Sequence, residues 1–169
     1  LQAFALCRGR AELKDLRFRV AGVAERYHAV FRAEADRLGI GAAVDFENYL
    51  SEDAMRRLYA GASLFLMPSL AEGFGIPVLE AMATGVPVAS SNAGSLPEVG
   101  GEAARYFDPA SVEAMADAMS DVLVNAGLRR ATIEAGRIQA RSFHPDSVRA
   151  RIDALWAEIE SLAQPEAAQ

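Results

Sequence analysis

The chain has 169 residues, is 51% hydrophobic and carries a formal net charge of −6, which favours one globular domain with a substantial core. Its arginines are scattered among acids, so the chain is a poor candidate for nonspecific binding to anionic membranes, and we expect no nucleic-acid partner. A single cysteine, Cys7, excludes an internal disulfide, and two histidines offer no metal cluster. No apolar run approaches the ~20 residues that span a bilayer.

Apolar segments alternate with helical segments along most of the chain. The opening residues 1–7 are typical of the end of a helix. Strands are expected over residues 16–22, 44–46, 63–68, 86–90 and 105–107. Helices are expected over residues 25–38, 51–60 and 76–84 and, after the last strand, over 111–125, 128–141 and 145–162.

Smaller signals refine this pattern. Residues 90–95 are typical of a turn, and Ser95-Leu-Pro-Glu98 matches a capping box at the start of one helical turn. The apolar spacing in the last helix predicts either a core face or an interface left without its partner, and we favour core positions for Leu155 and Ile159. Alternating strands and helices predict an α/β fold, a Rossmann-like doubly wound parallel sheet with extra C-terminal helices. Such sheets bind ligands beyond the carboxyl ends of their strands.

The segment 68–80 lies at such a strand end and is the strongest candidate for a binding site. Gly73 and Gly75 flank Phe74 there, and glycine lets a ligand approach the backbone closely. The helix that follows begins near Pro77, and its free N–H groups and dipole favour a phosphate. Its residue Glu80 stands among apolar neighbours, where an acid is costly unless a polar group meets it.

A carboxylate in that position could accept two hydrogen bonds from the hydroxyls of a ribose. Glu72, in the loop, could meet a second polar group of the same ligand. The spacing alone leaves a simpler interpretation open, because Glu80 could stabilise its own helix or pair with an arginine, and Glu72 could be a solvated loop acid.

These residues resemble a known family. The run Glu72-Gly-Phe-Gly-Ile-Pro-Val-Leu-Glu80 is similar to the Glu-x7-Glu motif of retaining GT-B glycosyltransferases of family 4, the glycosyl transferases group 1. Pro68-Ser69, residues 80–89, Leu96-Pro-Glu98 and Leu58-Tyr-Ala-x-Ala62 also resemble that family, so the resemblance covers nearly the whole chain.

The resemblance implies a role for each matching position. Glu72 would hold the donor sugar for reaction and is the catalytic candidate. Glu80 would bind the nucleotide ribose. The remaining donor-binding candidates contact the sugar and diphosphate or line the base pocket: Gly73, Phe74, Gly75 and Ile76, then Asn48, Tyr49 and Leu50. The family implies no cofactor and no metal, since a nucleotide-diphosphate sugar is the substrate.

Departures from the family pattern limit what this chain would do alone. In the family, a first strand precedes the segment matching Leu1 and is followed by an Arg and a Lys that clamp the diphosphate. The active site of the family is a cleft between this domain and an N-terminal acceptor domain. The chain does not begin with Met, and we expect it to be a piece of a longer protein. Residues 1–164 would form the C-terminal donor-binding half of a GT-B fold, and residues 165–169 a flexible tail.

The expected function is therefore the donor-binding domain of a retaining hexosyltransferase acting on a carbohydrate or lipid acceptor. The full-length parent would be the enzyme, cytoplasmic or peripheral at the inner membrane face, and the isolated chain inactive. An exposed sheet edge would favour self-association. Alternatives are a noncatalytic nucleotide- or sugar-binding module on the same fold and a related GT-B epimerase or phosphorylase.

Overall fold

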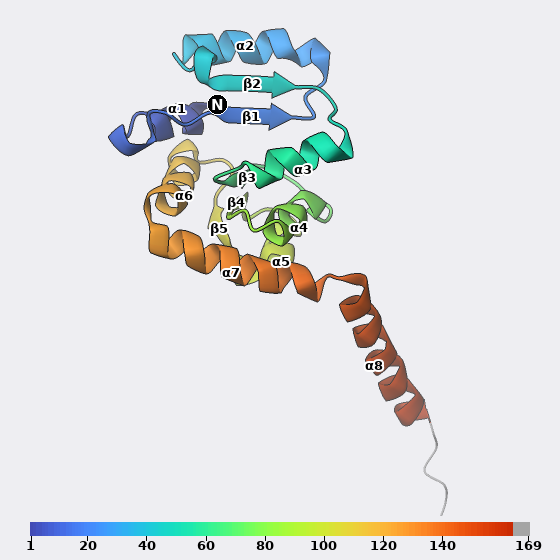
Figure 1. The fold of residues 1–169 in the computed structure, drawn as a ribbon. Coiled ribbons are helices and arrows are strands. Elements are labelled where there is room, and N and C mark those ends of the chain that lie inside the picture. Colours follow the sequence, from blue (N-terminus) through green and yellow to red (C-terminus); the bar gives the residue numbers. More distant parts are fainter. Residues whose placement is uncertain (164–169) are drawn as a thin grey trace, which may run out of the picture.

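In the computed structural model, which describes residues 1–163, parallel strands alternate with helices (Figure 1). The strands are β1 Phe18–Ala21, β2 Val44–Glu47, β3 Phe65–Met67, β4 Val88–Ser91 and β5 Ala104–Phe107. The helices are α1 Gln2–Arg8, α2 His28–Arg37, α3 Glu52–Ala60, α4 Ile76–Ala83, α5 Leu96–Gly100, α6 Val112–Val124, α7 Ala126–Ser142 and α8 Pro145–Ala163. The α/β class and the element order predicted from the sequence are confirmed. The expected tail, 165–169, lies outside the described residues.

The strands form two parallel sheets where the sequence predicts one. β1 pairs with β2, and β3, β4 and β5 pair in that order. Within the described residues, β1 and β3 each pair on one side only. Their other edges border a cavity of about 760 Å³, lined by residues 15–21 on one side and 61–68 on the other. The sheet is therefore interrupted between β1 and β3.

The core lies on both sides of β4, whose four residues are all buried. One cluster joins α1, β2 and α6, and includes Phe4, Cys7 and Met119. The other joins α4, α5 and β4. Burial of each large apolar side chain contributes roughly 1.5–3 kcal/mol to the stability of the fold. The loop after β3 is therefore attached to the well-packed part of the molecule around β4.

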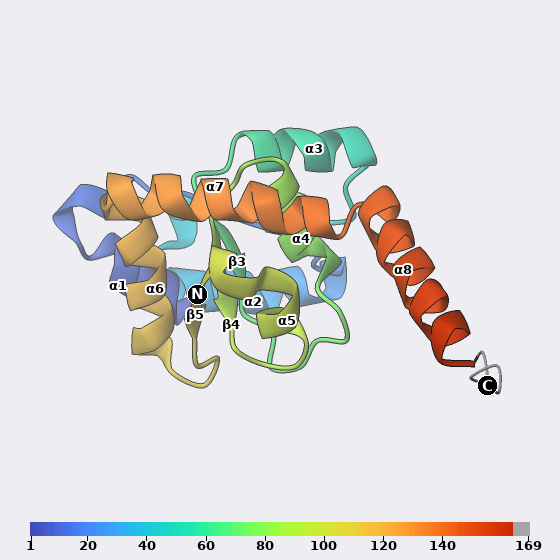
Figure 2. The ribbon, with the colours of Figure 1, turned by 90° about the horizontal axis from the view of Figure 1, so that it is seen from below.

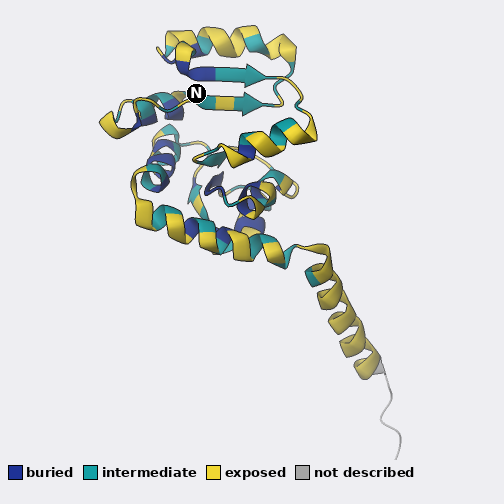
Figure 3. Ribbon diagram, in the orientation of Figure 1, coloured by how far each residue is buried: buried dark blue, intermediate teal, exposed yellow. Residues whose placement is uncertain are grey.

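Helix α8 extends away from this body (Figure 2). Its apolar residues are exposed (Figure 3): Leu155 is 56%, Trp156 59% and Ile159 43% accessible. The prediction that Leu155 and Ile159 belong to the core is wrong. Helical spacing identifies an apolar face, but it does not say what covers that face. Among the described helices, none is long and apolar enough to cross a membrane.

Candidate functional site

The loop 68–75 connects the end of β3 to the start of α4. Gly75 caps α4 with a φ of 106°, and Pro77 stands in the first turn, as the sequence predicts. A Cβ atom at position 75 would lie 2.8 Å from Leu96 Cδ2, so a side chain there would displace Leu96 as well as strain the backbone. The last residues of this loop are thereby held against α5.

Residues 91–95 support the loop: Ser91 ends β4, and residues 92–95 belong to the turn predicted over residues 90–95, of which residues 90 and 91 lie in β4. The Ser91 hydroxyl donates to the Ser69 carbonyl at 2.7 Å. The Ser95 hydroxyl lies 2.9 Å from the Phe74 carbonyl and 3.2 Å from the Glu72 carbonyl. The predicted capping box is wrong, because Ser95 gives no side-chain hydrogen bond to α5 and donates to the loop instead. The sequence does not identify Ser91 and Ser95 as residues that hold the loop 68–75 in place. The Ser/Gly-rich run 90–95 is the only sequence signal for this role.

Glu72 is half-buried at the start of the glycine pair. Its Oε1 accepts a hydrogen bond from the neighbouring Gly73 N–H at 3.1 Å. Phe74, beyond it, is 46% exposed, with its ring edge-on to Phe143 at 6.0 Å between centroids. Glu72 thus lies on an exposed loop whose backbone is held by hydrogen bonds from Ser91 and Ser95.

Glu80 is exposed and lines the cavity between the two sheets, together with Tyr59 and Pro77. The expectation that hydrocarbon encloses this acid is wrong. α4 buries Val78 and Met82 against the core, and Glu80, two residues from each, falls on the opposite side of the helix. The hydroxyl of Tyr59 donates to Glu80 Oε2 at 3.0 Å. In the described part of the chain, no arginine or lysine forms a salt bridge with Glu72 or Glu80.

The turn Asn48–Leu50 follows β2, at the carboxyl end of the other sheet. The Asn48 carbonyl accepts a hydrogen bond from the Gly22 N–H at 3.4 Å, and Tyr49 is 94% exposed. Among residues 1–163 only glycines have positive φ, so Asn48 does not use the left-handed conformation that asparagine tolerates. No hydrogen bond in the described structure joins this turn to the loop 68–75.

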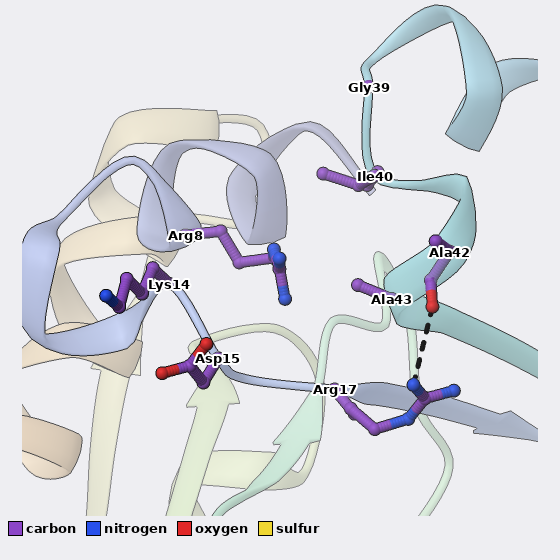
Figure 4. A pocket seen from close by; sticks show the side chains of 8 residues that line it. All are labelled: Arg8, Lys14, Asp15, Arg17, Gly39, Ile40, Ala42 and Ala43. Atoms are coloured by element: carbon purple, nitrogen blue, oxygen red, sulfur yellow. Dashed lines mark hydrogen bonds between the residues drawn. The ribbon is translucent and has the colours of Figure 1, made fainter.

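A second hollow, of about 260 Å³, lies before β1 and β2, at the opposite end of these strands (Figure 4). It contains Arg8, Lys14 and Arg17, but Lys14 and Arg17 point away from each other. Arg17 donates to Asp45 at 2.8 Å. These cations do not converge on one point, so this hollow is a poor anion site. Across residues 1–163, no group of three His, Cys, Asp or Glu residues could hold a metal ion.

Comparison with known proteins identifies the family of this strand-loop-helix unit. The family model described as "Glycosyl transferases group 1" matches residues 1–139. The chain belongs to the glycosyl transferases group 1. That match includes the loop 68–75, α4 and the residues 91–95 that hold the loop in place.

Among known proteins of similar sequence, O-antigen chain mannosyltransferase B of Escherichia coli is 40% identical over 100 residues, covering 59% of this chain and 26% of the relative. The MMP alpha-(1->4)-mannosyltransferase of Mycolicibacterium hassiacum is 42% identical over 89 residues, covering 51% of this chain and 22% of the relative. The matched part of the chain therefore spans only about a quarter of the length of these relatives.

Solved structures share the fold. HepE of Anabaena in complex with UDP superposes with a TM-score of 0.77 at 19% identity, covering 93% of this chain and 44% of that one. The C-terminal domain of the group 1 glycosyl transferase LpcC from Francisella tularensis superposes with a TM-score of 0.72 at 21% identity, covering 84% of this chain and 75% of that one. These GT-B neighbours confirm the predicted fold class.

Proposed function

We propose that the chain is the donor-binding domain of a retaining, family 4 glycosyltransferase that moves a hexosyl group from a nucleotide-diphosphate sugar to a carbohydrate or lipid acceptor. The observation that carries the proposal is Glu80, an exposed carboxylate on the wall of a large cavity, one turn inside a helix whose N-terminus has no side-chain cap. Two mannosyltransferases among the relatives and a UDP complex among the structural neighbours support it.

Glu72, Glu80 and the amino end of α4 would each bind a different part of the donor. Glu80 accepts hydrogen bonds from the ribose hydroxyls of the nucleotide. The amino end of α4 and the Phe74–Ile76 backbone favour the diphosphate, because unpaired N–H groups and the helix dipole attract negative charge. Glu72 accepts hydrogen bonds from the donor sugar and orients its anomeric carbon. Tyr49, exposed after β2, borders the base together with Asn48 and Leu50.

The acid Glu72 orients the sugar and is not proposed as a nucleophile. Leaving-group charge is stabilised by the helix and by cations of the full-length protein, so the reaction is proposed to proceed without a metal or other cofactor. The acceptor is bound by the part of the protein that this chain does not contain. The full-length protein is proposed to act in the cytoplasm, peripheral to the inner membrane face.

The test is titration calorimetry of UDP, GDP and ADP against the full-length protein, followed by NMR of the product formed from GDP-mannose or UDP-glucose. We expect micromolar binding of one nucleotide and retention of the anomeric configuration. Glu80→Gln should weaken nucleotide binding, whereas Glu72→Gln should lower kcat and leave nucleotide affinity unchanged. Absence of nucleotide binding would overturn the proposal. Binding without transfer to any acceptor would favour a noncatalytic module.

A further inference from the structure

Tyr59 connects two helices that border the candidate site. It lies in the last turn of α3, is 8% exposed, and its ring packs against Phe65 with 5.7 Å between centroids. Its hydroxyl donates a hydrogen bond of 3.0 Å to Glu80 Oε2 on α4, and this is the shorter of its two polar contacts. Burial and the hydrogen bond to Glu80 raise the pKa of the Tyr59 hydroxyl, so it remains a donor throughout the physiological range.

The partner of this hydroxyl is an exposed acid. A solvent-exposed glutamate side chain ordinarily samples several rotamers, and ordering it on ligand binding costs free energy. The 3.0 Å bond from Tyr59 fixes Oε2 of Glu80, and a hydrogen bond to an ionised acceptor is stronger than one between neutral groups. In the described structure, Oε1 of the same carboxylate has no donor.

We propose that Tyr59 is a positioning residue: its hydroxyl holds one oxygen of the Glu80 carboxylate so that the carboxylate is oriented, before ligand arrives, to accept the two vicinal hydroxyls of a ribose. The inference rests on the proposed function, in which Glu80 binds ribose. It adds a residue that does not touch the ligand, and it gives a role to the hydroxyl of a buried tyrosine in α3.

A purely structural role for Tyr59 is the alternative. Its hydroxyl also lies 3.5 Å from the Pro77 carbonyl, so it could serve only to join α3 to α4. The two roles predict different measurements. If Tyr59 only joins the helices, removing its hydroxyl changes the free energy of unfolding alone. If Tyr59 orients Glu80, removing its hydroxyl also changes the affinity for ribose, and only while Glu80 is present.

The experiment is a double-mutant cycle in the full-length protein with Tyr59→Phe, Glu80→Gln and the double variant. Titration calorimetry would measure the Kd of the nucleoside diphosphate that the wild type binds and of its 2′-deoxy analogue. Phenylalanine keeps the ring on Phe65, so the fold is retained. Tyr106→Phe is the matched control, because that half-buried hydroxyl donates to the Gly101 carbonyl at 2.9 Å and lies outside the proposed site.

We expect Tyr59→Phe to weaken binding of the ribonucleotide roughly 5- to 10-fold, the net size of one typical hydrogen bond. The preference for ribose over 2′-deoxyribose should shrink, Tyr59→Phe should cause little further loss in the Glu80→Gln background, and Tyr106→Phe should bind like the wild type. If Glu80→Gln weakens binding but Tyr59→Phe leaves affinity and ribose preference unchanged, the positioning role is overturned and the proposed function survives. If Glu80→Gln binds like the wild type, both are overturned.

Discussion

Gly94 and the backbone of Glu72 are in direct contact. A Cβ atom at position 94 would lie 2.5 Å from the Glu72 carbonyl oxygen and 3.0 Å from its amide nitrogen. Gly94 also has a φ of 58°, a conformation that side chains rarely adopt. The turn after β4 therefore supports the acidic loop closely only because residue 94 has no side chain. Position 72, the proposed catalytic acid, depends on this contact for its backbone position.

Gly94→Ala should destabilise the protein by about 2–3 kcal/mol, since it combines left-handed strain with a backbone collision. The matched control is Gly22→Ala, at a φ of 80° with no atom within 4 Å of the added Cβ. That substitution should cost only the strain, about 1 kcal/mol. Urea unfolding of both variants measures the difference. Equal losses would show that the contact between residue 94 and the Glu72 backbone is not tight.

The alkaline stability of the protein should depend on Tyr106. Burial raises the pKa of Tyr106 to about 12 from its ordinary value of 10.0. Between these values the unfolded chain loses this proton and the folded chain keeps it, so stability is fully present below pH 10 and falls as the pH rises toward 12. Tyr106→Phe should lose less stability than the wild type between pH 9 and pH 11.5 in urea unfolding. Parallel curves for the two proteins would contradict this.

The isolated chain should self-associate, because β1 and β3 each have an edge that pairs with no strand among residues 1–163 and that offers hydrogen-bonding groups to another copy. Sedimentation velocity at increasing protein concentration should show dimers or larger species. The exposed face of α8 could also associate, so Ile159→Lys serves as the control and should leave the association intact. A clean monomer at high concentration, or association that Ile159→Lys abolishes, would contradict the role of the strand edges.

The sequence predicts most of the elements because their signals are local. The apolar run at 63–68 and the glycine at 85 determine a strand and a helix end with little help from the rest of the molecule. Ser95 shows where this fails: its hydroxyl donates to Phe74, 21 residues away, and a capping pattern cannot reveal such a partner.

The candidate site shows the same limit. The identities of Glu72 and Glu80 followed from their motif, but the exposure of Glu80 depends on the cavity between two sheets, which no local pattern encodes. Tyr59 stood in the recognised run Leu58-Tyr-Ala-x-Ala62, yet only the folded structure places its hydroxyl on Glu80. The apolar spacing of α8 predicted a buried face, and the described residues leave that face uncovered.

The most direct test of the central claim is a crystal structure of the full-length protein soaked with the nucleoside diphosphate that it binds. Both ribose hydroxyls should lie within about 3 Å of the Glu80 carboxylate, a hydrogen-bonding distance, with Tyr59 still donating to Oε2. A ribose bound elsewhere, or a Glu80 side chain turned out of the cavity and paired with an arginine, would contradict it.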